Sequence, residues 1–455
     1  MKKHLNENPV KPTGIHIVAL VLACLAIGSA STTFALVPAP DGGYPGGNTA
    51  EGQAALSSLT TGTYNTAVGF FSLLTNAQGN FNTGIGAGTL LANTADRNTA
   101  IGAGALLSNT AGNFNTANGA FALVTNTEGG FNTANGESAL QKNTTGSYNT
   151  ATGASALFNN TEGGENTAIG YQALLLNTTG GGNTANGSLA LLNNSIGNDN
   201  TATGRSALYQ NTTGNQNTAD GASALLSNTT GSDNTASGTN ALSLNTEGNS
   251  NTADGVSALG NNTTGQLNTA TGAGALLSNT LGNSNTANGV AALATNTTGQ
   301  LNTAIGAGAL HNNIIGNSNT VLGVEAGFFL TDNNNIDIGV QVRGLAGESN
   351  TIRIGDNLPQ EGQSNCYIGG IIDGAVDPDA FLVMVDRNNK LGTHIQSGPV
   401  LRLKDVVEDH KKITELEVTV AALATQIKEQ AKQVQKVSAQ VEMNKPPTKV
   451  VLNNQ

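Results

Sequence analysis

The sequence contains little of what stabilises an ordinary globular domain. It has no Trp, aromatic residues make up 4% of its 455 residues, and charged residues make up 11%, against about 25% in typical soluble domains. So few charges also argue against charge-driven disorder. The net charge of −11 disfavours nucleic-acid binding, which needs a basic surface for phosphates. Glycine, in contrast, is abundant at 59 residues. This composition is typical of a repeat protein.

Residues 1–35 predict a secretory signal peptide. Basic residues precede an apolar run at 17–30, and small residues follow it up to Ala35. Cleavage after Ala35 leaves Cys366 as the only cysteine of the mature chain, so stability cannot come from an intrachain disulfide. Two alternatives stay open, namely a lipoprotein with a lipidated Cys24 and an uncleaved anchor. In each case the chain leaves the cytoplasm, and residues 36–47 are expected to be a linker.

One motif then recurs without interruption over residues 48–323. It reads Asn-Thr-Ala-x-Gly-x-x-Ala-Leu-x-x-Asn-Thr-x-Gly-x-x, and its positions are called columns 1 to 17 below. There are 17 copies, and the period is constant at 17 except for one step of 16 between Asn82 and Asn98. Strict periodicity of this kind indicates a solenoid. The predicted structural positions are columns 1, 2, 5 and 9, which in one copy are Asn166, Thr167, Gly170 and Leu174.

A single copy cannot fold alone. Ordering its backbone costs about 1–2 kcal/mol per residue, whereas burying its one Leu contributes roughly 1.5–3 kcal/mol. Copies must therefore stack, and a unit of this length is too short for a helical hairpin. We expect one parallel β-coil per copy, with columns 3 and 9 inward and columns 2 and 4 outward. The column 5 glycine marks a positive φ or a close backbone approach, stacked asparagines form a ladder, and Ala-Leu-x-x-Asn makes a brief helical turn.

The period shortens after Gly323. Asn335, Asn350 and Asn365 follow one another at a spacing of 15, which predicts further, degenerate coils with a period of 15 to 16 over 324–370. Residues 371–400 are expected to form a neck that contains a strand at 381–385.

Residues 401–443 predict a coiled-coil helix. Apolar residues recur every seven positions, with others between them, which is the heptad pattern of a coiled coil and implies a homo-oligomer. The predicted oligomerisation residues are Val406, Ile413, Leu416, Val420, Leu423, Ile427, Val434, Val437 and Val441. Asp409 and Gln430 are polar residues at position d, the second of the two apolar positions of the heptad. The heptads therefore leave dimer and trimer open. The alternative is an amphipathic helix that lies on its own rod. Residues 444–455 are expected to be a disordered tail.

The repeats, for example residues 166–174, resemble the head repeats of YadA-like trimeric autotransporter adhesins. They resemble bacterial secreted tail-fibre-domain proteins more closely, because residues 350–355 and 367–371 also match. The resemblance implies a left-handed parallel β-roll, a homotrimer and a surface or adhesive role. Two departures lead us to expect neither a self-made membrane anchor nor self-cleavage. The C-terminal end lacks the alternating strands of a membrane barrel, and Ser397 and Lys404 do not match the Ser–Lys dyad of the self-cleaving chaperone.

The resulting prediction is an all-β solenoid, a left-handed parallel β-roll of 17-residue coils, followed by a C-terminal α-helical coiled coil. We expect a secreted or surface-exposed, non-catalytic, adhesin-like fibre that contacts a host-cell, matrix or glycan surface. We expect no cofactor, no metal and no nucleic acid, because His311, His394 and His410 are scattered and the acids are spread along the coils. The alternatives are an ice- or carbohydrate-binding solenoid that uses a Thr ladder, as at Thr184, Thr201 and Thr218, and a β-helix enzyme acting on glycans.

Overall fold

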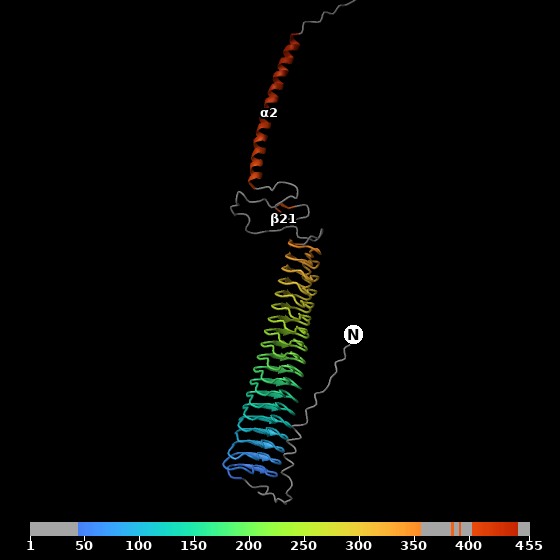
Figure 1. The fold of residues 1–455 in the computed structure, drawn as a ribbon. Helices are drawn as coiled ribbons and strands as arrows, with labels where there is room; N and C mark the ends of the chain where they lie inside the picture. The colour runs from blue at the N-terminus through green and yellow to red at the C-terminus, as the bar shows by residue number, and fades with distance from the viewer. Residues whose placement is uncertain (1–43, 356–383, 386–390, 393–402, 445–455) are drawn as a thin grey trace, which may run out of the picture. The chain divides into compact units, whose positions relative to one another are not determined.

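The computed structural model describes residues 44–355, 384–385, 391–392 and 403–444 (Figure 1). The predicted signal peptide, Cys24, Cys366 and the predicted tail from residue 445 on lie outside the described residues, as does most of the predicted neck. The chain divides into two units, Met1–Ser364 and Asn365–Gln455.

The described part of the first unit is a parallel β-solenoid of stacked coils (Figure 1). Its 19 strands each contain three residues, and each strand pairs in parallel with the next one along the chain. The strands are β1 (Thr49–Glu51), β2 (Thr66–Val68), β3 (Thr83–Ile85), β4 (Thr99–Ile101), β5 (Thr116–Asn118), β6 (Thr133–Asn135), β7 (Thr150–Thr152), β8 (Thr167–Ile169), β9 (Thr184–Asn186), β10 (Thr201–Thr203), β11 (Thr218–Asp220), β12 (Thr235–Ser237), β13 (Thr252–Asp254), β14 (Thr269–Thr271), β15 (Thr286–Asn288), β16 (Thr303–Ile305), β17 (Thr320–Leu322), β18 (Ile336–Ile338) and β19 (Ile352–Ile354). The prediction of an all-β parallel solenoid is confirmed.

Each coil contributes a small, uniform set of side chains to the core. In the coil of β8, Ala168, Ala173 and Leu174 are fully buried, whereas Thr167 is half-buried and Ile169 is exposed. The inward and outward columns are therefore as predicted. Because one Leu and two Ala are the only apolar side chains that this coil buries completely, its stability depends on the coils above and below it.

The column 5 glycines stand where neighbouring backbones crowd. Gly170 has a φ of 131°, and a Cβ placed on it would lie 2.6 Å from the carbonyl oxygen of Gly187 in the next coil. An L-residue rarely adopts this φ, and the neighbouring backbone leaves no room for its side chain. Both reasons given for an invariant glycine are confirmed.

The segment expected to form a helical turn is not helical. It makes two consecutive turns, closed by bonds from the Ala173 amide to the Gly170 carbonyl (3.4 Å) and from the Asn177 amide to the Leu174 carbonyl (3.2 Å). Gln172 and Leu174 have φ values of 55° and 52°, in the left-handed region. Left-handed residues interrupt a right-handed helix and turn the chain through the corners of the coil instead.

The coil step after Gly323 is 16, within the predicted period of 15 to 16, but the spacing of 15 from Asn335 to Asn350 does not give the register. Thr320 pairs with Ile336, and Ile336 pairs with Ile352, so each step is 16. The column 1 position of the β19 coil is therefore Thr351, whose amide donates to Asn335 Oδ1 at 3.1 Å. Asn350 occupies the preceding corner with a φ of 59°. The expected coil at Asn365 lies outside the described residues.

In the second unit, helix α2 (Leu403–Met443) spans 41 residues, close to the predicted range of 401–443. Strands β20 (Met384–Val385) and β21 (Leu391–Gly392) form an antiparallel pair, and β20 falls within the strand predicted at 381–385. Within the described ranges, no helix carries an 18-residue stretch apolar enough to cross a bilayer. The structure describes one copy of α2, so the coiled coil stays a prediction.

Candidate contact surfaces

Two ladders of buried asparagines join successive coils and set their register. In column 1, both the amide and Nδ2 of Asn166 donate to Asn149 Oδ1 at 3.1 Å, and Nδ2 also donates to the Gly180 carbonyl at 2.9 Å. In column 12, Asn177 Nδ2 donates to Asn160 Oδ1 at 2.8 Å and to the same carbonyl at 2.9 Å. These side chains are fully buried, so they hold the coils in register and do not meet a partner.

The outward face of the sheet carries a regular row of threonines beside an irregular row. Column 2 is Thr in every strand from β1 to β17, and paired strands align Thr with Thr, as in Thr184 with Thr201 and Thr201 with Thr218. These three threonines are exposed. Column 4 beside them changes from coil to coil, for example from Thr203 to Asp220. The face is regular in geometry and mixed in chemistry.

A second surface lies at column 17 of six consecutive coils near the N-terminal end of the solenoid. We call it the aromatic ladder. It consists of Tyr64, Phe81, Arg97, Phe114, Phe131 and Tyr148. The five rings are 42–62% exposed. Adjacent ring centroids are 5.1 Å apart for Tyr64 and Phe81, 4.7 Å for Phe114 and Phe131, and 5.0 Å for Phe131 and Tyr148.

The rings of the ladder are nearly parallel, with interplanar angles of 13°, 10° and 5° in these three pairs. Stacked rings cover each other's faces, so the exposed area of the ladder consists mainly of ring edges. Ring edges carry the positive end of the aromatic quadrupole. The ladder therefore presents apolar ring edges along its side, with the ring faces covered by neighbouring rings.

Arg97 fills the gap in the stack. Its guanidinium carbon lies 5.8 Å from the ring centroid of Phe81 and 5.1 Å from that of Phe114, so the cation sits between two aromatic rings. Arg97 is exposed and ends the one copy of the repeat that is a residue shorter than the others. The ladder is therefore a continuous apolar ridge with one positive charge.

The aromatic ladder is confined to the first coils. Further along column 17 the residues include Glu165, Asp199 and Asp233, and between residues 159 and 327 the only aromatic residues are Tyr171 and Tyr209. The ladder was not predicted from the sequence, because column 17 varies among the copies. The detectable signal was a run of aromatics at the repeat spacing.

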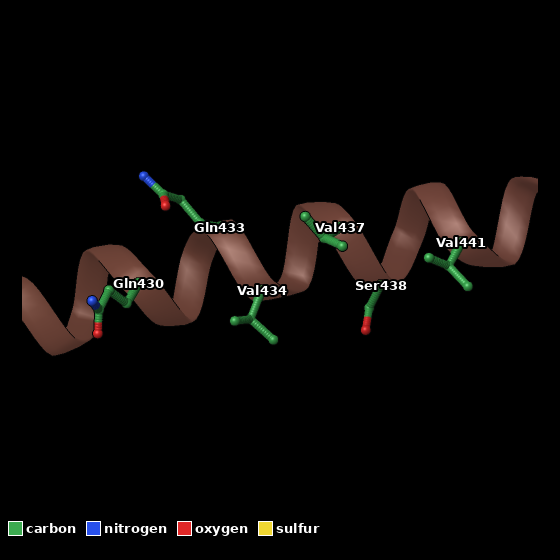
Figure 2. Close-up of a pocket in the computed structure, with 6 residues that line it drawn as sticks. All are labelled: Gln430, Gln433, Val434, Val437, Ser438 and Val441. Atoms are coloured by element: carbon green, nitrogen blue, oxygen red, sulfur yellow. The ribbon is translucent and has the colours of Figure 1, made fainter.

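Helix α2 exposes the third surface. The side chains predicted to mediate oligomerisation are 51–66% exposed on the single helix: Ile413, Leu416, Val420, Leu423, Ile427, Val434, Val437 and Val441. Val406 lies in the same helix, but its side chain is outside the described residues. Six side chains of this helix, drawn in Figure 2, line a shallow pocket: Gln430, Gln433, Val434, Val437, Ser438 and Val441. Its lining comes from one helix, so it is an open surface and not a closed cavity.

The last described coils contain a buried acid. Asp337 is fully buried, and neither of its carboxylate oxygens has a hydrogen-bond partner among the described residues. Burial raises the pKa of Asp337 to about 6, and the positive charge of Arg353 limits the rise. Arg353 forms an ion pair with Glu348. Burial acts to raise the pKa of Glu348, but its hydrogen bond with Arg353 helps to lower the pKa overall.

These groups do not form a metal centre. Among residues 44–355 and 403–444, no three His, Cys, Asp or Glu side chains come together in a way that could hold a metal ion. His311 stacks on Phe328 at 5.1 Å, and His410 is exposed on α2. His394 lies outside the described residues.

No family model matches the chain, and no curated protein or solved structure matches it either.

Proposed function

We propose that this chain is a secreted or surface-exposed, non-catalytic fibrous protein of the adhesin type. The solenoid acts as a spacer and presents a contact surface, and α2 joins copies of the chain in a coiled coil. The left-handed winding and the trimeric state implied by the family resemblance belong to this proposal. The expected partner is a host-cell, matrix or glycan surface.

The observation that carries the proposal is the placement of the aromatic ladder. The first coils expose a rigid ridge of five rings and Arg97, together with Val68, Ile85 and Ile101 in column 4 of the same coils. The coils of β9 to β15 have Asn, Thr, Ser or Asp in column 4. A long stack with a polar sheet face in its middle coils and an aromatic ridge in its first coils is suited to holding a contact surface away from its point of attachment. Exposed apolar patches of this kind are typical of interaction sites.

The exposed stripe on α2 supports oligomerisation. Eight apolar side chains at heptad spacing are more than half exposed on the single helix, and a coiled coil would bury them. β-Branched residues at heptad position a with Leu at position d favour a coiled coil of two helices. Asp409 and Gln430 stand at position d and interrupt that pattern. We therefore take the trimer from the family resemblance.

Two measurements test this function. The first is the mass of the secreted chain by light scattering, with and without residues 401–455. We expect a trimer that the truncation abolishes, and a monomer in both cases would contradict the proposal. The second compares binding of Phe131→Ser and Leu267→Ser variants to cell surfaces, matrix proteins and a glycan panel. Both residues are exposed in column 17, but only Phe131 belongs to the aromatic ladder.

We expect Phe131→Ser to weaken binding at least tenfold and Leu267→Ser to leave it unchanged. Equal binding by both variants would mean that the ladder is not the contact surface. Circular dichroism of both variants shows whether the solenoid is intact, so that a loss of binding can be assigned to the surface.

One further observation favours a second candidate, the binding of ice or crystalline polysaccharide. The column 2 threonines form an in-register row from Thr49 to Thr320. Strands in a sheet repeat every 4.7–4.9 Å, so the row presents hydroxyl groups at a regular spacing. Thermal hysteresis or retention on insoluble polysaccharide by the wild type, lost in a Thr201→Val and Thr218→Val variant, would support this function.

A further inference from the structure

The last described strands invert the pattern of the rest of the solenoid. In β1 to β17 the inward residue is Ala, Gly or Val, and the first outward residue is Thr. Strands β18 and β19 read Ile336-Asp337-Ile338 and Ile352-Arg353-Ile354. In β18, Asp337 is fully buried and the two isoleucines are half-buried. In β19, Arg353 is half-buried, whereas Ile352 and Ile354 are 67% and 61% exposed. The end coils thus place their charges inward and their aliphatic side chains outward.

The inversion is not a slip in register. A shift by one residue would turn the isoleucines inward, but the pairing of Thr320 with Ile336 continues the column 2 alignment. The asparagine ladder holds the same register, because the amide of Asn335 donates to Asn319 Oδ1 at 2.9 Å. Burying an acid while exposing isoleucine is unfavourable for a strand whose outer face meets water. The pattern is favourable only where that outer face is covered.

The aliphatic residues form one continuous surface, which we call the isoleucine face. It is defined by Ile305, Leu322, Ile336, Ile338, Ile352 and Ile354, which lie on the adjacent strands β16 to β19. The outward columns 2 and 4 of these four strands contain no charged residue, and the only polar residues in them are Thr303 and Thr320. From β5 to β15, Ile169 is the only aliphatic residue in column 4.

We propose that the isoleucine face packs against the same face of other copies of the chain. This inference rests on the proposed function, in which α2 assembles the copies, and it adds a contact between solenoids at their last coils. A face without charges is complementary to itself, and rotational symmetry brings identical residues of the copies to the same height. Asp220 and Asp254 in column 4 of the middle coils would meet their like-charged equivalents if the whole solenoids packed together. These charges disfavour packing at the coils of β11 and β13, and the contact is assigned to the aliphatic end coils.

The test uses the full-length chain in a background with Cys24→Ser and Cys366→Ser. An Ile352→Cys variant is compared with Thr252→Cys, which also lies in the outward column 2 but on the middle coils. A disulfide requires Cα atoms within about 7 Å. Under mild oxidation we expect Ile352→Cys to form covalent dimers of the chain as the main product, and Thr252→Cys to remain uncross-linked.

A second pair of variants measures the contribution of the face. We expect Ile352→Thr with Ile354→Thr to raise the dissociation constant of the oligomer at least tenfold, while circular dichroism shows an intact solenoid. Val256→Thr with Val290→Thr removes two similarly exposed aliphatic side chains from the middle coils and should leave the constant unchanged.

The outcomes separate this inference from the proposed function. An oligomer that depends on residues 401–455 but shows neither the cross-link nor the change in dissociation constant would overturn the isoleucine contact and leave the proposed function standing. A chain that is monomeric when intact would overturn both. Cross-linking of Ile352→Cys to a different protein would overturn self-association as the use of this face.

Discussion

Replacing one asparagine of the buried ladder should weaken the coil that follows it. In the coil of β11, Asn217 makes four side-chain hydrogen bonds. Its Nδ2 donates to Asn200 Oδ1 at 3.1 Å and to the Gly231 carbonyl at 2.8 Å, and its Oδ1 accepts from the amide and Nδ2 of Asn234, both at 3.1 Å. Asn217→Ala removes all four bonds within a site that is closed to water.

The magnitude follows from which groups keep another partner. The Gly231 carbonyl still accepts from Asn228 Nδ2, Asn234 Nδ2 still donates to the Gly248 carbonyl, and Asn200 Oδ1 still accepts from the backbone amide of residue 217. Only the amide of Asn234 is left without a partner. An orphaned buried amide costs about 1–3 kcal/mol and each other lost bond about 0.5–1.5 kcal/mol, so we expect a local loss of about 4 kcal/mol.

Hydrogen exchange is the appropriate assay, because long repeat arrays open locally and a single unfolding free energy does not describe them. We expect the Asn234 amide to exchange about a thousandfold faster in Asn217→Ala, as about 4 kcal/mol corresponds to roughly three powers of ten. Thr218→Ala is the matched control, since Thr218 is exposed and its backbone bond to the Asn234 carbonyl is retained. Equal protection in the two variants would refute the role given to the ladder.

Three further perturbations are predicted from the same coils. Gly170→Ala directs its Cβ at the Gly187 carbonyl and should lower the stability of the solenoid by about 3 kcal/mol or more. Gly274→Ala has open space around its Cβ and should lower the stability by about 1 kcal/mol. Thermal melting compares the two variants. Leu225→Asp buries an unpaired charge and should destabilise adjacent coils by about 3–5 kcal/mol, so an unchanged melting temperature would contradict the inward Leu. Burial raises the pKa of Asp337 from 3.8 to about 6. As the pH rises, the unfolded state therefore loses this proton before the folded state does. The stability of the end coils should fall by about 2 kcal/mol between pH 4 and pH 6. Exchange of β18 amides, corrected for intrinsic pH dependence, should show this fall in the wild type and not in Asp337→Asn.

The architecture was predictable from the sequence because the period and a few chemically constrained columns determine it. Ala168 and Leu174 stand in the apolar columns that recur along the repeat, so the core had to form from them. Gly170 could be assigned to a crowded corner because only glycine tolerates both the backbone angle and the close approach. These inferences use properties common to the copies.

The corners of the coil were not predictable in the same way. Leu174 has a φ of 52°, which is unfavourable for an isolated leucine and gave no signal in the sequence. The coil imposes that angle, because burying the side chain and pairing the backbone outweigh the local cost. The spacing of 15 from Asn335 to Asn350 did not give the register, because it aligned Asn350 by residue type. Gly339 and Gly355 follow the paired strands β18 and β19 directly, so they mark equivalent corners and give the correct register.

The contact surfaces were missed because they depend on departures from the repeat. The aromatic ladder occupies a column in which the copies share no residue type, so comparing all copies hides the run from Tyr64 to Tyr148. The isoleucines of β18 and β19 were expected only as part of degenerate coils at the end of the rod. Their exposure follows from the register set at Asn335, because in a three-residue strand the register decides whether one residue or two face outward. In this protein the uniform columns build the scaffold, and the columns that change along it form the proposed contact surfaces.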